Sequence, residues 1–347
     1  MPAMAASHPY ERLTPQRVLD ALQTVGWRGD GRLLQLNSYE NRVFQVMLED
    51  GSAVVAKFYR PGRWSDAQIL EEHRFALQLA QHEVPVVAPL PLLRDEPPVV
   101  ELRCAGEPPT LACWTDASAE FRLSVYARRA GHGPELDDPS VLAWLGRFVA
   151  RLHAVGTREP FRTRRRLDAA TYGHQPLRRL LDGGHVTPAE RAAFEATAHA
   201  ALTLVDAAFA RAGPLATLRL HGDFHPGNIL WRDEGPHIVD LDDCCRGPAV
   251  QDLWMLLSGS RDEMRGQLSH VLGGYEAFMR LDARELALIE PLRTLRMLHH
   301  SAWLAERWSD PAFPVAFPWF GGAAYWSQQT RALREQIEAM QQDPLAP

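Results

Sequence analysis

Residues 220–256 read LHGDFHPGNILWRDEGPHIVDLDDCCRGPAVQDLWML, and three polar residues in this stretch suit phosphate chemistry. Asp223 is followed by Asn228 five positions later, and Asp240 closes an apolar run at 237–239 that we expect to form a short strand. A hydroxyl that attacks a γ-phosphoryl group needs a carboxylate to orient it and accept its proton, which suits Asp223. Magnesium takes hard oxygen ligands, which suits Asn228 and Asp240. The stretch therefore predicts the metal and phosphate end of a phosphotransferase.

A structural explanation competes with this one, because Asp and Asn are common in loops and Gly222, Pro226 and Gly227 are turn-formers. The whole pattern H-G-D-x-H-x-x-N, followed by an apolar strand, an acidic doublet and Q-D-L-W, is far less expected by chance than H-G-D alone. We therefore favour the catalytic interpretation. Flanking strands at 218–220 and 229–231 are expected to anchor the loop.

Lys57 lies in the strand-like run V-V-A-K-F, where an ammonium group needs an anionic partner because burying an unpaired charge is expensive. The α- and β-phosphates of ATP would supply that anion. In the helix that follows, Glu71 or Glu72 can reach Lys57 as an ion pair. We choose Glu72, since it lies three residues before Phe75 and seven before Leu79 on the inward face. The alternative is that Lys57 is a solubilising residue on an edge strand.

The turn that should cover the phosphates, residues 37–42 (NSYENR), contains no glycine. Backbone N–H groups can still hold phosphate in a nest, and the side chains of Ser38 and Asn41 are expected to help. The competing interpretation of this segment is a polar hairpin turn without a ligand.

The composition is that of an ordinary globular protein of 347 residues, 46% apolar and 23% charged, with a net charge of -6. This charge argues against a general nucleic-acid or anionic-membrane binder, because such proteins bind through clustered Lys and Arg. The N-terminus has no cationic start followed by an apolar segment, and no window approaches the roughly 18 apolar residues that span a bilayer. We expect a cytoplasmic protein that binds neither nucleic acid nor membrane. Its four cysteines, at 104, 113, 244 and 245, are expected to be reduced and mostly buried.

The hydrophobic pattern changes along the chain from a period of two to a helical period. After a short helix that begins at Thr14, strands are expected at 32–36, 42–48, 53–59, 99–104, 110–114 and 121–126, with an Asp-Gly turn at 49–51 and one long helix at 65–82. Helices are expected at 141–154, 188–212, 262–279, 283–307 and 322–340. The result is an α+β chain, in which an antiparallel sheet of about five strands with one long helix precedes a larger, mostly α-helical part. A composition shift near Gly131 and Gly133 places the boundary, giving lobes at 1–128 and 129–347.

The strings HGDFHPGNILW and VDLDD resemble the signature motifs of the aminoglycoside phosphotransferase and choline kinase superfamily, which has a bilobal, protein-kinase-like fold. Five longer strings closely resemble the bacterial stress response kinase A family: LNSYENRV, AKFYRP, ILEEHRFALQL, LHGDFHPGNILWRD and VDLDDCCRGPAVQDLWML. These strings span residues 36–256, and the lengths before and after them also suit that family.

This resemblance implies ATP- and magnesium-dependent phosphorylation of serine or threonine in proteins by a cytoplasmic monomer that serves survival under stress. Carried over residue by residue, it implies Asp223 as the proton acceptor, Asn228 and Asp240 as magnesium ligands, Ser38 as the phosphate-loop residue, and Lys57 with Glu72 as the general kinase pair. Only eleven residues lie between Asp240 and Asp252, so a long phosphorylatable activation loop is absent from the sequence. Asp252 is expected to accept hydrogen bonds from the backbone of the catalytic loop. The expected adenine hinge, residues 126–129, matches the family weakly.

Two other functions stay open. A small-molecule kinase of the same fold, acting on an aminoglycoside, choline or homoserine hydroxyl, would share every residue above. A pseudokinase-like binding module is disfavoured by the complete set of Lys57, Asp223, Asn228 and Asp240. The basic run at 162–166 and the aromatic run at 303–326 are interpreted as a solvated face and core packing, with substrate docking as the alternative for each.

Overall fold

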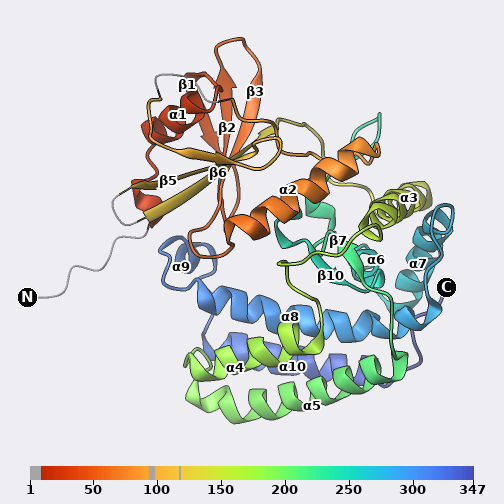
Figure 1. Ribbon diagram of the computed structural model, residues 1–347. Coiled ribbons are helices and arrows are strands. Elements are labelled where there is room, and N and C mark those ends of the chain that lie inside the picture. The colour runs from red at the N-terminus through yellow and green to blue at the C-terminus, as the bar shows by residue number, and fades with distance from the viewer. Residues whose placement is uncertain (1–8, 94–97, 117–118) are drawn as a thin grey trace, which may run out of the picture. The chain divides into compact units, whose positions relative to one another are not determined.

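Figure 1 shows the computed structural model, which describes residues 9–93, 98–116 and 119–347. The described residues form two compact units. The first holds those of Met1–His132 together with Leu230–Asp242, and the second holds Gly133–Ile229 and Asp243–Pro347. An antiparallel sheet in the first unit and helices in most of the second confirm the predicted α+β class. The lobes at 1–128 and 129–347 stay a proposal. The sequence predicts that the N-terminus does not form a signal peptide, and residues 1–8 of that segment lie outside the described residues.

The first unit is built on a six-stranded sheet in the order β1-β2-β3-β6-β5-β4, in which each of the six predicted strand segments contributes one strand, so the sheet is slightly larger than the expected size of about five strands. The strands are β1 (Gly29–Gln35), β2 (Arg42–Leu48), β3 (Ala53–Phe58), β4 (Arg103–Ala105), β5 (Leu111–Asp116) and β6 (Ala119–Ala127), and all neighbours are antiparallel. In β2 the side chains of Phe44, Val46 and Leu48 alternate into the core, as the period of two in a strand requires.

Two helices of the first unit begin at capping residues. Thr14 precedes α1 (Pro15–Thr24), and Ser65 precedes α2 (Asp66–Gln81), where it forms a capping box with Gln68. An N-cap of this kind contributes about 1 kcal/mol to helix stability. The inward face of α2 buries Ile69, Glu72, Phe75 and Leu79, so the predicted spacing of that face is confirmed.

The second unit is mostly helical. Its helices are α3 (Pro139–Gly156), α4 (Gln175–Asp182), α5 (Pro188–Ala212), α6 (Val250–Trp254), α7 (Arg261–Tyr275), α8 (Ile289–Glu306), α9 (Ala312–Ala316) and α10 (Ala323–Met340). In Figure 1, α4, α5, α8 and α10 lie beside one another. Helices α3 and α7 pack at glycines, because a Cβ on Gly146 would lie 2.0 Å from the carbonyl oxygen of Val271, and one on Gly274 would lie 1.9 Å from that of Ala143.

The structure corrects two predicted elements. The helix predicted at 283–307 is a 3-10 helix, η5 (Ala283–Leu288), followed by α8. Pro291 lies in the first turn of α8, where its missing N–H is no loss, and this favours a new helix start there. The strand predicted at 99–104 begins only at Arg103, because the N–H groups of Val99 and Val100 donate to the Thr24 hydroxyl instead of a strand.

Short strands hold the loops around the opening motif. Strand β7 (Leu218–Leu220) pairs with β10 (Cys245–Gly247), and β8 (Ile229–Leu230) pairs with β9 (His237–Ile238). The predicted flanking strands of the loop at 221–228 are therefore confirmed. A 3-10 turn, η3 (Pro226–Asn228), closes this loop.

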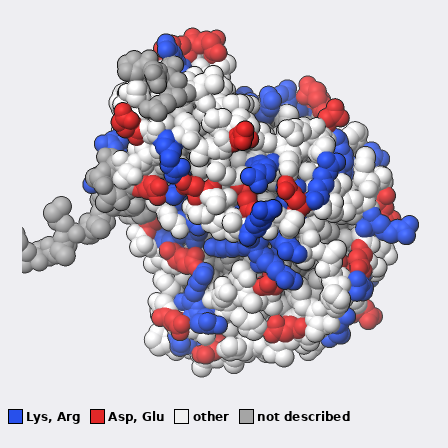
Figure 2. Space-filling view, in the orientation of Figure 1, with Lys and Arg blue, Asp and Glu red and all other residues white. Residues whose placement is uncertain are grey.

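Charged side chains of both signs are mixed over much of the face in Figure 2, in keeping with the net charge of -6. Among the helices of the described residues, none combines the length and the apolar character that crossing a bilayer requires.

Candidate active site

Lys57 stands in the middle of the first unit's sheet. Its strand β3 lies between β2 and β6, so the alternative explanation of an edge-strand lysine is wrong. The side chain is only 8% exposed. Lys57 is also the one lysine in the whole sequence, beside 36 arginines. A chain that uses arginine for every other cation but keeps lysine here indicates a position that needs a compact ammonium group.

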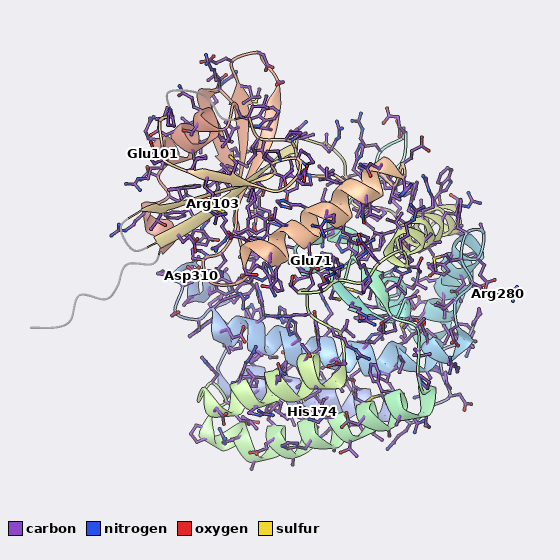
Figure 3. The ribbon with its side chains drawn as sticks, in the orientation of Figure 1. Glu71, Glu101, Arg103, His174, Arg280 and Asp310 are labelled. Atoms are coloured by element: carbon purple, nitrogen blue, oxygen red, sulfur yellow. The ribbon has the colours of Figure 1, made fainter. Side chains whose placement is uncertain are left out.

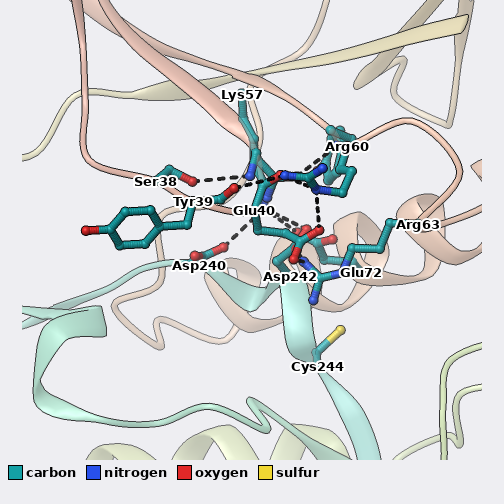
Figure 4. Close-up of polar contacts among 12 residues, drawn as sticks. Ser38, Tyr39, Glu40, Lys57, Arg60, Arg63, Glu72, Asp240, Asp242 and Cys244 are labelled. Atoms are coloured by element: carbon teal, nitrogen blue, oxygen red, sulfur yellow. Dashed lines mark hydrogen bonds and ion pairs between the residues drawn. The ribbon is translucent and has the colours of Figure 1, made fainter. Parts of the chain in front are cut away.

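Three carboxylates surround this ammonium group (Figure 4). The Nζ atom of Lys57 lies 3.1 Å from Oδ1 of Asp240, 3.0 Å from Oδ1 of Asp242 and 3.8 Å from Oε1 of Glu72. Burial alone would lower the pKa of Lys57, but the charges of Asp242, Asp240 and Glu72 raise it well above its usual value. The ammonium form is therefore the stable one. Asp242 is a site residue that the sequence reasoning missed, although it belongs to the acidic doublet after Asp240.

Helix α2 supplies Glu72 to this cluster. Glu71, its neighbour on α2 (Figure 3), is half-buried, and Glu72 is the residue of this helix that pairs with Lys57 at 3.8 Å. Behind the cluster, the ring of His73 fixes α2 against the sheet. Its Nδ1 lies 2.8 Å from the Thr110 hydroxyl, and its Nε2 lies 2.9 Å from the Tyr59 hydroxyl. Because the whole network is buried, it should hold α2 in one position relative to β3.

Two arginines tie the turn at 37–42 to the segment after Asp240 (Figure 4). The guanidinium of Arg63 forms ion pairs with Asp242 and, at 3.5 Å, with Glu40. The Nε atom of Arg60 lies 3.0 Å from Oε1 of Glu40, and Arg60 also donates to the carbonyl oxygens of Tyr39 and Glu40. These residues were also missed, and the string R-P-G-R-W at 60–64 was the available signal.

The predicted phosphate-turn residues have local roles in this arrangement. The hydroxyl of Ser38 accepts the N–H of Asn41 at 3.3 Å, and the amide oxygen of Asn41 accepts the N–H of Arg60 at 3.0 Å. Asn41 is buried, so its side chain holds the turn to the end of β3. Contact of either side chain with phosphate stays a prediction.

Asp240 has an unusual backbone. Its φ is 59°, in the left-handed region, which costs a residue other than glycine roughly 1–3 kcal/mol and is concentrated at functional sites. Its side chain is 51% exposed, whereas that of Asp242 is 4% exposed. Asp240 can therefore offer a carboxylate oxygen to a cation while Asp242 stays with Lys57 and Arg63.

In the second unit, Asp252 organises the loop that carries Asp223. Its two carboxylate oxygens accept the N–H groups of His221 at 2.8 Å and Gly222 at 2.9 Å, and His153 Nε2 lies 3.1 Å away. The predicted role of Asp252 as an acceptor for the loop backbone is confirmed. His221 itself has a packing role, because its ring is fully buried against Phe224.

Asp223 faces two basic side chains. Oδ1 lies 2.5 Å from Nη1 of Arg296, and Oδ2 lies 3.4 Å from Nε2 of His225. Since Nδ1 of His225 accepts the N–H of Gly227, a neutral ring carries its proton on Nε2, facing Asp223. Burial would raise the pKa of Asp223, but the hydrogen bond from His225 and the charge of Arg296 lower it well below its usual value. Asp223 is therefore ionised at neutral pH.

Asn228 is fixed by the same loop. Its Nδ2 donates to the carbonyl oxygen of Asp223 at 3.0 Å, which leaves its amide oxygen as the atom that can bind a cation. Amide and carboxylate oxygens are the donors that magnesium prefers, so Asn228 and Asp240 fit this metal by their chemistry. In the described residues, three or more His, Cys, Asp or Glu side chains do not gather as a metal cluster.

The features discounted from the sequence are mostly structural. Arg164 is buried and donates to the carbonyl oxygen of Cys244, so the basic run is not wholly a solvated face. The aromatic run packs largely in the core, with Phe313 and Trp326 fully buried and Trp319 half-exposed. The four cysteines are free thiols, three of them buried, as expected.

Comparison with known proteins places this geometry in context. The model of the phosphotransferase enzyme family matches residues 32–288. Stress response kinase A of Escherichia coli (strain K12) is 42% identical over 336 residues, which cover 97% of this chain and 96% of that protein. A relative with the same identity and coverage in Salmonella typhimurium (strain LT2) is named serine/threonine protein kinase RdoA.

Two solved structures share the fold. An amicoumacin kinase in complex with AMP-PNP, Ca2+ and Ami has a TM-score of 0.71 at 20% identity, covering 98% of this chain and 96% of its own. A microcompartment-associated aminopropanol kinase has a TM-score of 0.70 at 18% identity, covering 94% and 98%. These likenesses confirm the predicted fold.

Proposed function

Because the chain belongs to the phosphotransferase enzyme family and, within it, to the stress response kinase A family, we propose that it is an ATP- and magnesium-dependent serine/threonine protein kinase of the bacterial stress response. The observation that carries the phosphotransfer is the sole lysine of the chain, buried among Glu72, Asp240 and Asp242. The name of the Salmonella relative supports a protein acceptor. A cytoplasmic, monomeric enzyme is part of the proposal.

On the donor side, Lys57 binds the α- and β-phosphates of ATP. Glu72 keeps the ammonium group in place when nucleotide leaves, since the ion pair is held by α2 and the His73 network. The turn around Ser38 covers the phosphates with backbone N–H groups, and Arg60 and Arg63 hold its shape through Glu40.

Asn228 and Asp240 hold magnesium through an amide oxygen and a carboxylate oxygen. Bound magnesium would neutralise charge on the β- and γ-phosphate oxygens. The left-handed backbone of Asp240 supports this assignment, because strained conformations of this kind are concentrated at functional sites.

On the acceptor side, Asp223 orients the attacking hydroxyl and accepts its proton. Its low pKa makes it a weak base, which suits phosphoryl transfer through a loose transition state, where positioning contributes more than proton abstraction. Asp252 sets the geometry of the loop through the N–H groups of His221 and Gly222.

A second candidate is a small-molecule kinase. The two solved structures above have the same fold, and their names give amicoumacin and aminopropanol kinases. Both candidates need the same donor side, so the acceptor distinguishes them.

The test is phosphoryl transfer from labelled ATP to generic protein acceptors, to the chain itself, and to a panel of aminoglycosides, choline and aminopropanol. The proposal expects labelled serine or threonine in protein, lost when magnesium is removed and regained on its return. Strong labelling of a small molecule with no phosphoprotein would replace the proposal by the second candidate. Failure of all acceptors together with absent ATP hydrolysis would indicate a binding module.

A further inference from the structure

Arg296 lies beside Asp223, although no sequence motif singles it out. It belongs to α8, far along the chain from the loop, and its Nη1 is 2.5 Å from Oδ1 of Asp223. The Arg296 side chain is 40% exposed, so water competes for this ion pair and the guanidinium can exchange partners.

The contact leaves Asp223 able to receive a hydroxyl. Oδ1 is buried and accepts no hydrogen bond from the described residues, and its close partner is the guanidinium of Arg296, which forms an ion pair with it. A hydroxyl that donates to this oxygen must arrive next to the guanidinium of Arg296. The group that flanks the hydroxyl in the acceptor therefore meets the positive charge of Arg296.

This charge has opposite effects on the two acceptor classes. Choline and amino alcohols carry a cationic nitrogen within a few bonds of their hydroxyl, and like charges placed together at an interface cost several kcal/mol. A serine or threonine flanked by Asp or Glu brings a carboxylate, which a guanidinium binds with two parallel hydrogen bonds. Arg296 thus favours acidic acceptors.

The other residues on this face of α8 do not form a site that would bind a cationic acceptor. His300 and Trp303 follow Arg296 at spacings of four and seven, which place them on the same face of the helix. Burial, aided by Arg296, lowers the pKa of His300, so the ring is neutral. The ring of Trp303 is stacked by His300 at 5.7 Å, and the guanidinium of Arg307 lies 5.3 Å from its centre. Trp303 therefore does not offer an open aromatic cage to an ammonium ligand.

The carboxylates of α8 are also occupied. Glu290 pairs with Arg293 at 3.4 Å, and Glu306 pairs with Arg179 and, at 3.1 Å, with Arg307. The helix that places a cation at Asp223 thus has no unpaired carboxylate to hold an amine.

We propose that Arg296 selects the acceptor: it leaves Asp223 to bind a carboxylate that flanks the acceptor hydroxyl, so that the enzyme prefers serine or threonine in acidic protein segments and disfavours amine-bearing acceptors. The inference rests on the proposed function, because it requires Asp223 to meet the acceptor hydroxyl.

The experiment uses the full chain with ATP and magnesium and three peptides of equal length, each with one serine flanked by Glu, by Gln or by Lys. Values of kcat and KM are measured for the wild type, Arg296→Glu and Arg296→Lys. The control is Arg331→Glu, the same charge change on α10, where the side chain is 82% exposed. Choline and aminopropanol complete the acceptor panel, and thermal melts report whether each variant folds.

The wild type should prefer the Glu peptide over the Lys peptide by at least about tenfold in kcat/KM, the effect of one close charge pair. Arg296→Glu should reverse that order, mainly through KM, while Arg296→Lys and Arg331→Glu keep it. Equal use of all three peptides by the wild type, or an equal fall in kcat on all of them in Arg296→Glu, would overturn the inference and leave the protein kinase standing. Labelling of choline or aminopropanol without any peptide would instead refute the proposed protein acceptor.

Discussion

At the scale of single residues, Lys57 lies at the centre of a buried charge cluster, and it is also the one lysine in the sequence. Three carboxylates depend on its ammonium group, and the other cations of the chain are all arginines. The lysine should therefore be needed both for its charge and for its shape.

Replacing Lys57 by Met is expected to lower the free energy of unfolding by about 3–5 kcal/mol, because it removes a cation from beside the buried carboxylates of Glu72 and Asp242. The loss should be smaller at pH 5 than at pH 8. Without the ammonium, less positive charge holds these carboxylates in their ionised form, so burial favours their protonation and the stability of the variant falls as pH rises. Denaturant unfolding at both pH values measures this. A loss that is equal at the two values would contradict the role of these carboxylates.

The companion variant Lys57→Arg keeps the charge and changes only the shape. We expect it to fold nearly as well as the wild type but to raise the KM for ATP by at least about tenfold, because a planar fork cannot replace a point charge on the phosphates. An unchanged KM for ATP would remove Lys57 from the donor site.

Some of this residue-level arrangement could be predicted. Glu72 was distinguishable from Glu71 because helical spacing places it on the face of Phe75 and Leu79. Arg296 was not predictable, because its contact with Asp223 depends on how α8 packs in the second unit, which no local pattern encodes. Asp242 is visible in the sequence as part of the motif, but only the structure shows that it is buried and pairs with Lys57.

At the scale of elements, the loop that carries Asp223 depends on a glycine. Gly222 has a φ of 83°, and a Cβ there would lie 2.3 Å from the carbonyl oxygen of Asp243. A side chain would have to displace the backbone, and with it the N–H that Asp252 accepts.

We expect Gly222→Ala to lower the free energy of unfolding by about 2–4 kcal/mol, adding about 1–3 for the clash to about 1 for the left-handed backbone. Phosphoryl transfer should fall with it. Gly184→Ala is the matched control, since Gly184 also has a positive φ of 67° in the second unit but open space around its Cβ. If both variants lose the same stability, the close approach to Asp243 does not matter.

Glu285 on η5 supports the neighbouring element α6, which carries Asp252. Its Oε2 accepts the N–H of Val250 at 2.9 Å, at the start of α6. Burial raises the pKa of Glu285 to about 7. The folded state thus holds a proton that the unfolded state releases near pH 4.5, so this group stabilises the fold at low pH and loses that effect as pH rises towards 7.

Glu285→Gln should therefore be more stable than the wild type above pH 7, and its stability should fall less than that of the wild type between pH 5 and 8. The expected difference is on the order of 3 kcal/mol, since each pKa unit corresponds to about 1.4 kcal/mol. Unfolding free energies across that range test it, with Glu335→Gln on α10 as an exposed control. The same pH dependence in the wild type and in Glu285→Gln would contradict the assignment.

Elements with strong local signals agreed best with the sequence. Capped, periodic segments such as α2 and α5 were predictable almost to the residue. Short ones such as α4 and α9 were not, because one or two turns carry too little periodicity to stand out. At 99–104 a side-chain acceptor, the Thr24 hydroxyl, took N–H groups that the strand pattern assigned to a sheet.

At the scale of the whole molecule, the chain has two compact units. Lys57, Glu72 and Asp240 of the proposed donor side belong to the first unit, and Asp223, the proposed base, belongs to the second. Its relatives cover nearly the full length, so the family's phosphotransfer applies to the chain as a whole. The acceptor is the part that relatives define least, because kinases of several acceptors share this fold. Under the inference above, Arg296 is the residue of this chain that selects the acceptor.

The central claim is that Asp223 orients and deprotonates the acceptor hydroxyl in transfer from ATP. The most direct measurement is kcat for protein phosphorylation by Asp223→Ala beside the wild type, at saturating ATP and magnesium, with thermal melts to show that both fold. We predict that kcat falls by at least about 10²-fold, the low end for a general base, while the KM for ATP changes little. Turnover close to that of the wild type would contradict the account.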